Sequence, residues 1–202
     1  MAQPQQARSI KTRRTILEAA GALFGAIGYA ATTTEMIIER SGVPRGTMYF
    51  HFPSKEAVAD AIVAAEADVI VPPVRRLKLQ SLIALTYRYA DVLMHDPVLQ
   101  GLVRLSVDRV QPSHGEPWRT AHRSLTELIR AAAENGELLP SVEPERFATV
   151  LQSAFTGVQL SSQVSTNRKD LPERVTDMWR YLLPGVAIPG LLPSLSLPDL
   201  PD

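Results

Sequence analysis

The stretch from residue 32 to residue 55, TTTEMIIERSGVPRGTMYFHFPSK, constrains the fold more than any other part of the chain. Thr32 and Glu35 have the spacing of a capping box, in which a hydroxyl and a carboxylate satisfy free amides at the start of a helix. Gly42 is suited to end this short helix, because glycine readily adopts the left-handed conformation that follows a helix C-terminus. Pro44 favours the first turn of a second helix. Two short helices joined by a tight turn predict a helix-turn-helix.

The second helix of this pair, residues 44–51, has the features of a helix that reads DNA. Gly46 is a poor choice for a helix interior, where glycine costs about 1 kcal/mol relative to alanine, but its missing side chain lets the backbone approach a phosphate or a base edge. Arg45 carries the donor fork that suits guanine, and Thr47 can contact a base edge or a thymine methyl. A helix of this kind fits the major groove. The alternative is a compact three-helix unit with a solvated charged face.

Side chains around this helix are candidates for contacts with the DNA backbone. Tyr49, His51 and Lys55 have the reach to hydrogen-bond phosphate oxygens. Basic residues near the N-terminus, including Arg14, precede or open the first helix and could reach the backbone or the minor groove, although each one taken singly could equally be a solvated charge. The predicted DNA-binding set is Arg8, Lys11, Arg13, Thr33, Pro44, Arg45, Gly46, Thr47, Tyr49, Phe50, His51 and Lys55.

The charge distribution supports this interpretation. Residues 1–55 hold seven Lys/Arg and three acidic residues, a net charge of +4, although the whole chain has 21 of each and is neutral. A basic first quarter on an otherwise acidic protein predicts a polyanionic partner. The composition, 45% hydrophobic and 21% charged, is that of an ordinary globular protein without a membrane span or signal peptide, so we expect a cytoplasmic protein. The absence of cysteine excludes disulfides and thiolate metal sites.

An ordered series of residues is similar to the DNA-binding signature of TetR-family transcriptional regulators, over about residues 9 to 60. The series is Gly28-Tyr29, Thr32-Thr33, Ile37, Gly42-Val43, Gly46, Tyr49, His51-Phe52 and Lys55. Ile38 and Ser41 stand where the family usually has alanines, and Arg45 stands where lysine is common. These departures concern the DNA sequence that is recognised more than the fold.

Apolar periodicity predicts an all-α protein of about nine helices, with no strand. The first helix ends before Gly28, the fourth begins at Ser54 and runs towards Ile70, and further helices start near Leu79, Pro97, Trp118, Pro144 and Leu171. We expect three regions: an N-terminal arm with the DNA-binding domain (1–55), a ligand-binding and dimerisation domain (56–183), and a proline-rich tail (184–202) that is extended or disordered. The boundary falls inside the fourth helix, which can therefore transmit movement.

The last two helices predict self-association. Both are strongly apolar, and the first shows small Ala154 and Gly157 among large residues, which favours a four-helix interface in a homodimer. The alternative is that both apolar stripes are filled within one chain.

A narrower resemblance concerns the second domain. The runs Arg8–Arg13 and Asp96–Leu99, Arg104-Leu105 and Trp118 are similar to the γ-butyrolactone and furan autoregulator receptors of the TetR family. In those receptors a tryptophan at this place lines the signal pocket, so the resemblance implies that role for Trp118. A tryptophan on an apolar stripe could instead be a core residue. Other polar or apolar positions of the predicted helices complete the candidate ligand set: Thr86, Tyr87, Tyr89, Leu93, Leu102, Gln152, Phe155, Thr156 and Gln159.

Catalysis finds no support in the sequence. The four histidines are scattered, with no zinc-protease motif, phosphate loop or nucleophile elbow, and the adjacent Ser113-His114 cannot face one another as nucleophile and base. We therefore expect no enzyme, no cofactor and no metal. The sequence and its resemblance predict a dimeric repressor that binds a pseudo-palindromic operator in double-stranded DNA and is released by a small γ-butyrolactone, furan or butenolide. The alternatives are a regulator of efflux or metabolism that answers a different hydrophobic ligand, or an activator.

Overall fold

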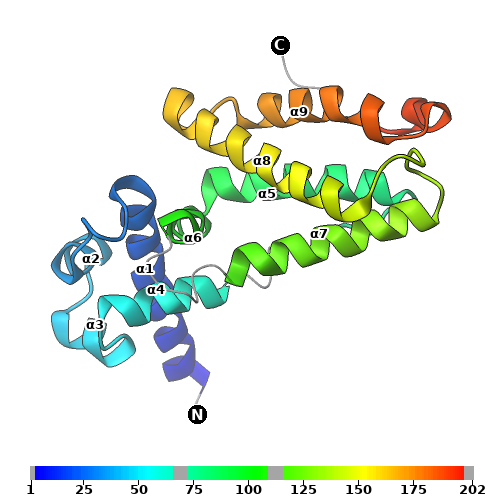
Figure 1. The fold of residues 1–202 in the computed structure, drawn as a ribbon. Coiled ribbons are helices and arrows are strands. Elements are labelled where there is room, and N and C mark those ends of the chain that lie inside the picture. Colours follow the sequence, from blue (N-terminus) through cyan, green and yellow to red (C-terminus); the bar gives the residue numbers. More distant parts are fainter. Residues whose placement is uncertain (1–2, 66–71, 109–115, 198–202) are drawn as a thin grey trace. The chain divides into compact units, whose positions relative to one another are not determined.

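The computed structural model describes residues 3–65, 72–108 and 116–197, and these ranges contain helices and no strand (Figure 1). The only pairing of β type in them is an isolated antiparallel bridge between Leu138 and Ala187. The predicted all-α fold is therefore confirmed. The chain divides into two compact units: the first contains α1 to α4 and α6, and the second contains α5, α7 from Arg119 onward, α8, α9 and a 3-10 helix, η3.

The first unit is a helix-turn-helix supported by two longer helices. Its elements are α1 (Gln3–Ile27), α2 (Thr34–Ser41), α3 (Arg45–His51), α4 (Lys55–Ala64) and α6 (Pro97–Asp108). The apolar stripes of the sequence meet in one core, which includes Ile16, Ala20, Phe24, Ile37, Met48, Val58 and Ile62. The predicted end of α1 is confirmed, since Gly28 follows it with φ +82°. The continuation of α4 towards Ile70 lies outside the described residues.

Two features of this unit differ from the sequence-based expectation. The helix α1 begins at Gln3, so Arg8, Lys11 and Arg13 are helical and do not form an arm before the helix. The cap of α2 is Thr33 and not Thr32: the Thr33 hydroxyl accepts from the amide of Met36 at 3.2 Å. The buried Thr32 hydroxyl donates instead to the carbonyl of residue 28 at 2.8 Å, because the chain has already turned away from solvent there.

Helix α6 packs against α1 through glycines (Figure 1). A Cβ added to Gly101 would lie 2.6 Å from the Cα of Gly21, and one added to Gly21 would overlap the carbonyl of Pro97. The two backbones therefore touch, which only glycine allows. Because of this packing, α6 belongs to the first compact unit. The predicted boundary at residue 55 between a DNA-binding domain and a ligand-binding domain stays a prediction.

The second unit consists of α5 (Lys78–His95), most of α7 (Glu116–Glu134), α8 (Pro144–Thr166), α9 (Leu171–Val186) and η3 (Pro189–Ser194). Helices α8 and α9 lie side by side (Figure 1). The buried Glu137 fixes the start of α5, because its carboxylate accepts from the amides of Lys78 (2.9 Å) and Leu79 (2.8 Å).

Between α8 and α9 the chain turns through Asn167 (φ 55°) and Arg168 (φ 68°), both left-handed. Asp170 holds this corner together. The hydroxyls of Ser162 and Thr166, with the guanidinium of Arg174, donate to its carboxylate and hold its pKa at about 2.

The expectation for the C-terminal tail is wrong over the residues described. Helix α9 continues through Pro184 to Val186, and η3 follows it. Backbone bonds from Leu139 to Val186 (2.8 Å) and from Ile188 to Glu137 (3.1 Å) hold this segment in place. Pro189 is tolerated because it opens η3, where no helical amide donor is needed, whereas Pro184 and Pro193 lie inside α9 and η3 near their C-terminal ends. Residues 198–202 lie outside the described part of the chain.

Candidate nucleic-acid interface and ligand site

The local sequence positions α3 as a short, exposed helix. Gly42 adopts φ 66° and donates to the carbonyl of Ile38 at 3.0 Å, which ends α2. Pro44 stands at the N-cap of α3, one position before the predicted first turn. Met48 and Phe52 are buried and attach the helix to the core. The opposite side of α3 is therefore fixed in position while facing outward.

The outward side of α3 carries the predicted base-reading residues. Phe50 is 82% exposed, an unusual environment for a large apolar side chain. A Cβ added to Gly46 would meet nothing within 4 Å, so no packing inside the protein requires glycine there. Arg45 lies 5.5 Å from the Tyr49 ring and 3.6 Å from Glu35. Exposed ion pairs of this kind contribute little, so DNA can replace this one.

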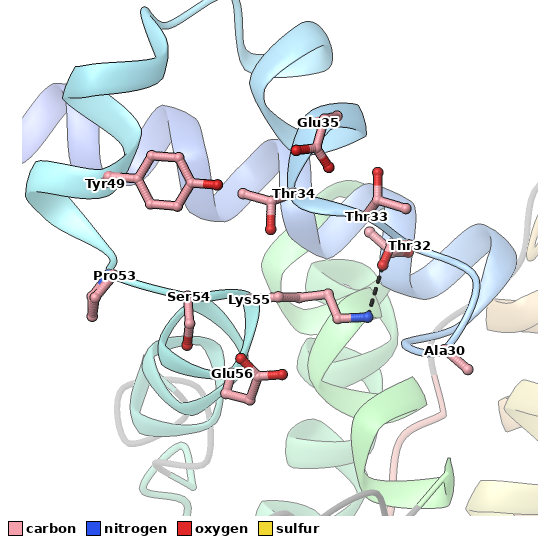
Figure 2. Close-up of a pocket in the computed structure, with 10 residues that line it drawn as sticks. All are labelled: Ala30, Thr32, Thr33, Thr34, Glu35, Tyr49, Pro53, Ser54, Lys55 and Glu56. Atoms are coloured by element: carbon pink, nitrogen blue, oxygen red, sulfur yellow. Dashed lines mark hydrogen bonds between the residues drawn. The ribbon is translucent and has the colours of Figure 1, made fainter.

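Beside α3 lies a shallow hollow of about 430 Å³ (Figure 2). Its walls include Tyr49, the N-cap residue Thr33 and the first residue of α2, Thr34. Hydroxyls at this place can donate to a phosphate, and the free backbone amides of the first helical turn carry the positive end of the helix dipole. Two carboxylates, Glu35 and Glu56, also line the hollow and oppose an anion there.

Lys55 has hydrogen-bond partners within the protein. Its ammonium donates to the carbonyl of Thr32 at 2.8 Å (Figure 2). It also donates to the carbonyl of Tyr29 at 2.9 Å and lies 4.1 Å from the centre of the Tyr29 ring. The Tyr29 hydroxyl donates to Glu56 at 2.9 Å, and burial together with this bond raises the pKa of Tyr29 to about 12. These contacts join the start of α4 to the turn between α1 and α2. A structural role is thus shown for Lys55, while its phosphate contact stays a prediction.

The other predicted DNA contacts are distributed along the same unit. Arg8, Lys11 and Arg13 are exposed on α1, and the Arg13 guanidinium lies 4.9 Å from the centre of the Phe52 ring. Arg14 is held by Glu18 at 2.7 Å and Asp96 at 3.5 Å. Thr47 and His51 are half-buried on α3.

The structure divides the predicted ligand-binding residues between the two units. Leu102 on α6 and Trp118 at the start of α7 belong to the first unit. Leu102 is buried, whereas Trp118 is 41% exposed and is therefore not a fully buried core residue. The second unit holds the remaining eight: Thr86, Tyr87, Tyr89 and Leu93 on α5, and Gln152, Phe155, Thr156 and Gln159 on α8.

Two of these eight residues, Thr86 and Tyr87, are hydrogen-bonded to α9. The Thr86 hydroxyl donates to the carbonyl of Ile83 at 2.7 Å and accepts from the indole of Trp179 at 2.8 Å. The Tyr87 hydroxyl is hydrogen-bonded to Thr176, and burial raises the pKa of Tyr87. Apolar periodicity in the sequence cannot show which polar group the indole of Trp179 reaches.

Two others bring aromatic and polar groups together on the inner side of α8. Phe155 packs edge-to-face on Tyr89, with ring centres 5.6 Å apart. The Gln152 amide oxygen lies 3.0 Å from Nδ1 of His122, a residue that sequence reasoning considered only for catalysis. This combination of an aromatic wall with amides is typical of a site for a small amphiphilic ligand.

Other kinds of site find no support in the described ranges. No cluster of His, Asp or Glu in them could hold a metal ion. None of the helices in them is long and apolar enough to cross a membrane.

Comparison with known proteins identifies the class. Residues 16–62 match the family model "Bacterial regulatory proteins, tetR family", and residues 76–189 match "Tetracyclin repressor-like, C-terminal domain". The chain belongs to the TetR family of bacterial regulators.

Several of the similar proteins are regulators from Streptomyces. The A-factor receptor protein of Streptomyces griseus is 34% identical over 93% of this chain and 68% of its own length. Among solved structures, the TetR regulator TylP of Streptomyces fradiae is 40% identical, with a TM-score of 0.79 over 95% of this chain and 93% of its own. A γ-butyrolactone receptor described as ArpA-like is 26% identical (TM-score 0.74; 90% and 91% covered). CprB from Streptomyces coelicolor, solved with its operator sequence, is 27% identical (TM-score 0.76; 93% and 94% covered).

Proposed function

We propose that this protein is a ligand-responsive transcriptional repressor that binds a pseudo-palindromic operator as a homodimer and is released by a small signalling molecule of the γ-butyrolactone, furan or butenolide type. The outward side of α3 carries this proposal: Gly46 leaves the backbone accessible, and Arg45 and Phe50 are exposed beside it within the basic segment of residues 1–55. Operator binding by CprB and ligand reception by the γ-butyrolactone receptor support it. The proposal includes no catalytic step. The protein would act on the chromosome in the cytoplasm.

Dimerisation is supported by the outer side of α8. Val150, Gly157 and Val164 are exposed and follow one another at seven-residue intervals, so they lie along one side of the helix. Val164 is 88% exposed, and Tyr181 on the neighbouring α9 is 81% exposed. Exposed apolar groups in a row are typical of an interface. Two reading helices are required, because one covers too few base pairs to select a single operator.

The dimer interface can be tested with charges. Val164→Glu and Ala154→Glu each place a carboxylate on or beside this row, and we expect monomers with weak operator affinity. Thr149→Glu is the matched control, since Thr149 is exposed on the same helix about a quarter turn away. Analytical ultracentrifugation at low concentration measures the outcome. A dimer that persists in both variants would place the interface elsewhere.

The repressor function is tested by operator release. An operator is first selected from random duplex DNA with the wild-type protein, and the complex is then titrated with butyrolactones, furans and butenolides. Arg45→Ala should cost about 1–3 kcal/mol of binding and relax the preference at one base position of each half-site. Trp118→Ala should raise the ligand concentration needed for release without lowering the melting temperature sharply. Failure to select any sequence, or release by none of the three ligand types, would contradict the respective part of the proposal.

A further inference from the structure

We propose that the ligand must present a hydrogen-bond donor, such as a hydroxyl group, to the side-chain amide oxygen of Gln159. This inference rests on the proposed function and makes it more specific. Gln159 lies on α8 and is 2% exposed, and its Oε1 atom is buried without a hydrogen-bond partner in the described part of the chain.

A buried amide oxygen without a partner is destabilising, because folding removes its hydrogen bonds to water and returns none. Such groups are rare in folded proteins, and a methionine of similar size would avoid the cost. The neighbouring polar groups do not share this state. The Gln152 amide oxygen faces His122, and the Thr156 hydroxyl donates to the carbonyl of Gln152 at 2.8 Å. On this side of α8, Gln159 therefore retains an unmet acceptor, which a bound molecule can satisfy.

The surroundings indicate what kind of molecule this is. Gln152 and Gln159 are seven residues apart and so share one side of α8, with Phe155 between them. Phe155 and Tyr89 form an edge-to-face aromatic pair beside them. An alkyl chain suits the aromatic pair, and a donor at its polar end suits Gln159. A γ-butyrolactone ring offers only acceptor oxygens, so the donor must be a substituent.

The first test is the stability of the protein without ligand. Gln159→Met should raise the melting temperature by about 2–4 °C, because it removes a buried unmet acceptor at little change in volume. Gln152→Met is the matched control on the same side of the helix and should lower the melting temperature, since it breaks the bond to His122. A lower melting temperature for Gln159→Met would show that the oxygen is already satisfied, for instance by water, and would overturn the proposal.

The second test compares a 2-(1-hydroxyalkyl)-γ-butyrolactone with the 2-acyl-γ-butyrolactone of equal chain length, which differ by a hydroxyl against a ketone. Wild-type protein should release operator at an at least about fivefold lower concentration of the hydroxyl compound, and Gln159→Met should abolish this ratio. A preference for the ketone, or an unchanged ratio in the variant, would overturn the donor requirement.

The proposed ligand class can fail separately. If neither lactone releases operator, decan-2-ol and decan-2-one provide the same comparison without a lactone, measured as ligand-induced thermal shifts of the full chain. A larger thermal shift with the alcohol than with the ketone, lost in Gln159→Met, would support the donor site and reject the lactone ligand class. Equal thermal shifts with the alcohol and the ketone would reject the donor site as well.

Discussion

Replacing Gly46 by alanine should stabilise the protein and weaken its binding to operator. These opposite effects are expected only if the glycine is needed for DNA binding and not for folding. Gly46 is helical and a Cβ there would meet no atom within 4 Å, so alanine fits without strain. Glycine costs about 0.5–1 kcal/mol in a helix relative to alanine, largely through the entropy of the unfolded chain. For a chain of this length that gain corresponds to a rise in melting temperature of about 1–4 °C.

The loss of DNA affinity follows from the same open space. If the α3 backbone approaches a phosphate or base edge at Gly46, the added methyl group overlaps that surface. Overpacking of this kind costs about 1–3 kcal/mol, which corresponds to a loss of about fivefold to 150-fold in affinity. The methyl group also faces no other part of the protein, so the effect on binding cannot come from altered packing.

Both quantities can be measured on one preparation. Thermal unfolding by circular dichroism gives the stability, and fluorescence anisotropy with a selected operator at fixed salt gives the affinity. If Gly46→Ala is more stable and binds operator as tightly as wild type, the α3 backbone does not approach DNA and the reasoning fails.

Four further predictions test other parts of the structure. Lys55→Met should lower the free energy of unfolding by about 2–3 kcal/mol, since two charge-assisted bonds are lost; unchanged stability with a salt slope smaller by about 0.9 would instead identify a phosphate contact. Asp170, whose pKa is about 2, contributes stability that is complete above pH of about 4 and lost as the pH falls to about 2, so acid unfolding of Asp170→Asn should lack this step. Gly21→Ala should lower stability in urea unfolding by about 1–3 kcal/mol through its overlap with the carbonyl of Pro97, and a neutral result would contradict the close crossing. Phe50→Ala should lose affinity for operator but become indifferent to replacing thymine by uracil, if the exposed ring contacts a thymine methyl; an unchanged preference would exclude this contact.

The sequence by itself determined the helix content and the helix-turn-helix, because both depend on local chemistry. Gly28 and Gly42 end helices through a backbone conformation that glycine adopts at little cost, and the structure shows φ +82° and φ +66° at these positions. Apolar periodicity marks which side of a helix is buried, and the stripes of α1 and α4 are buried at Ile16, Phe24, Val58 and Ile62. The family resemblance rested on the same local residues, and the comparisons confirm it.

Only the tertiary structure decided how polar groups pair across the chain. Lys55 donates to two carbonyls that are more than twenty residues away in the sequence. Thr86 accepts a hydrogen bond from the indole of Trp179. Residue spacing in the sequence predicts neither interaction. The extent of the C-terminal structure was missed for the same reason, since η3 depends on contacts of the segment with Glu137 and Leu139 and not on helix propensity. The unmet acceptor of Gln159 is likewise visible only in the fold: burial turns a hydrogen-bonding group into a cost when nothing nearby in space can pair with it.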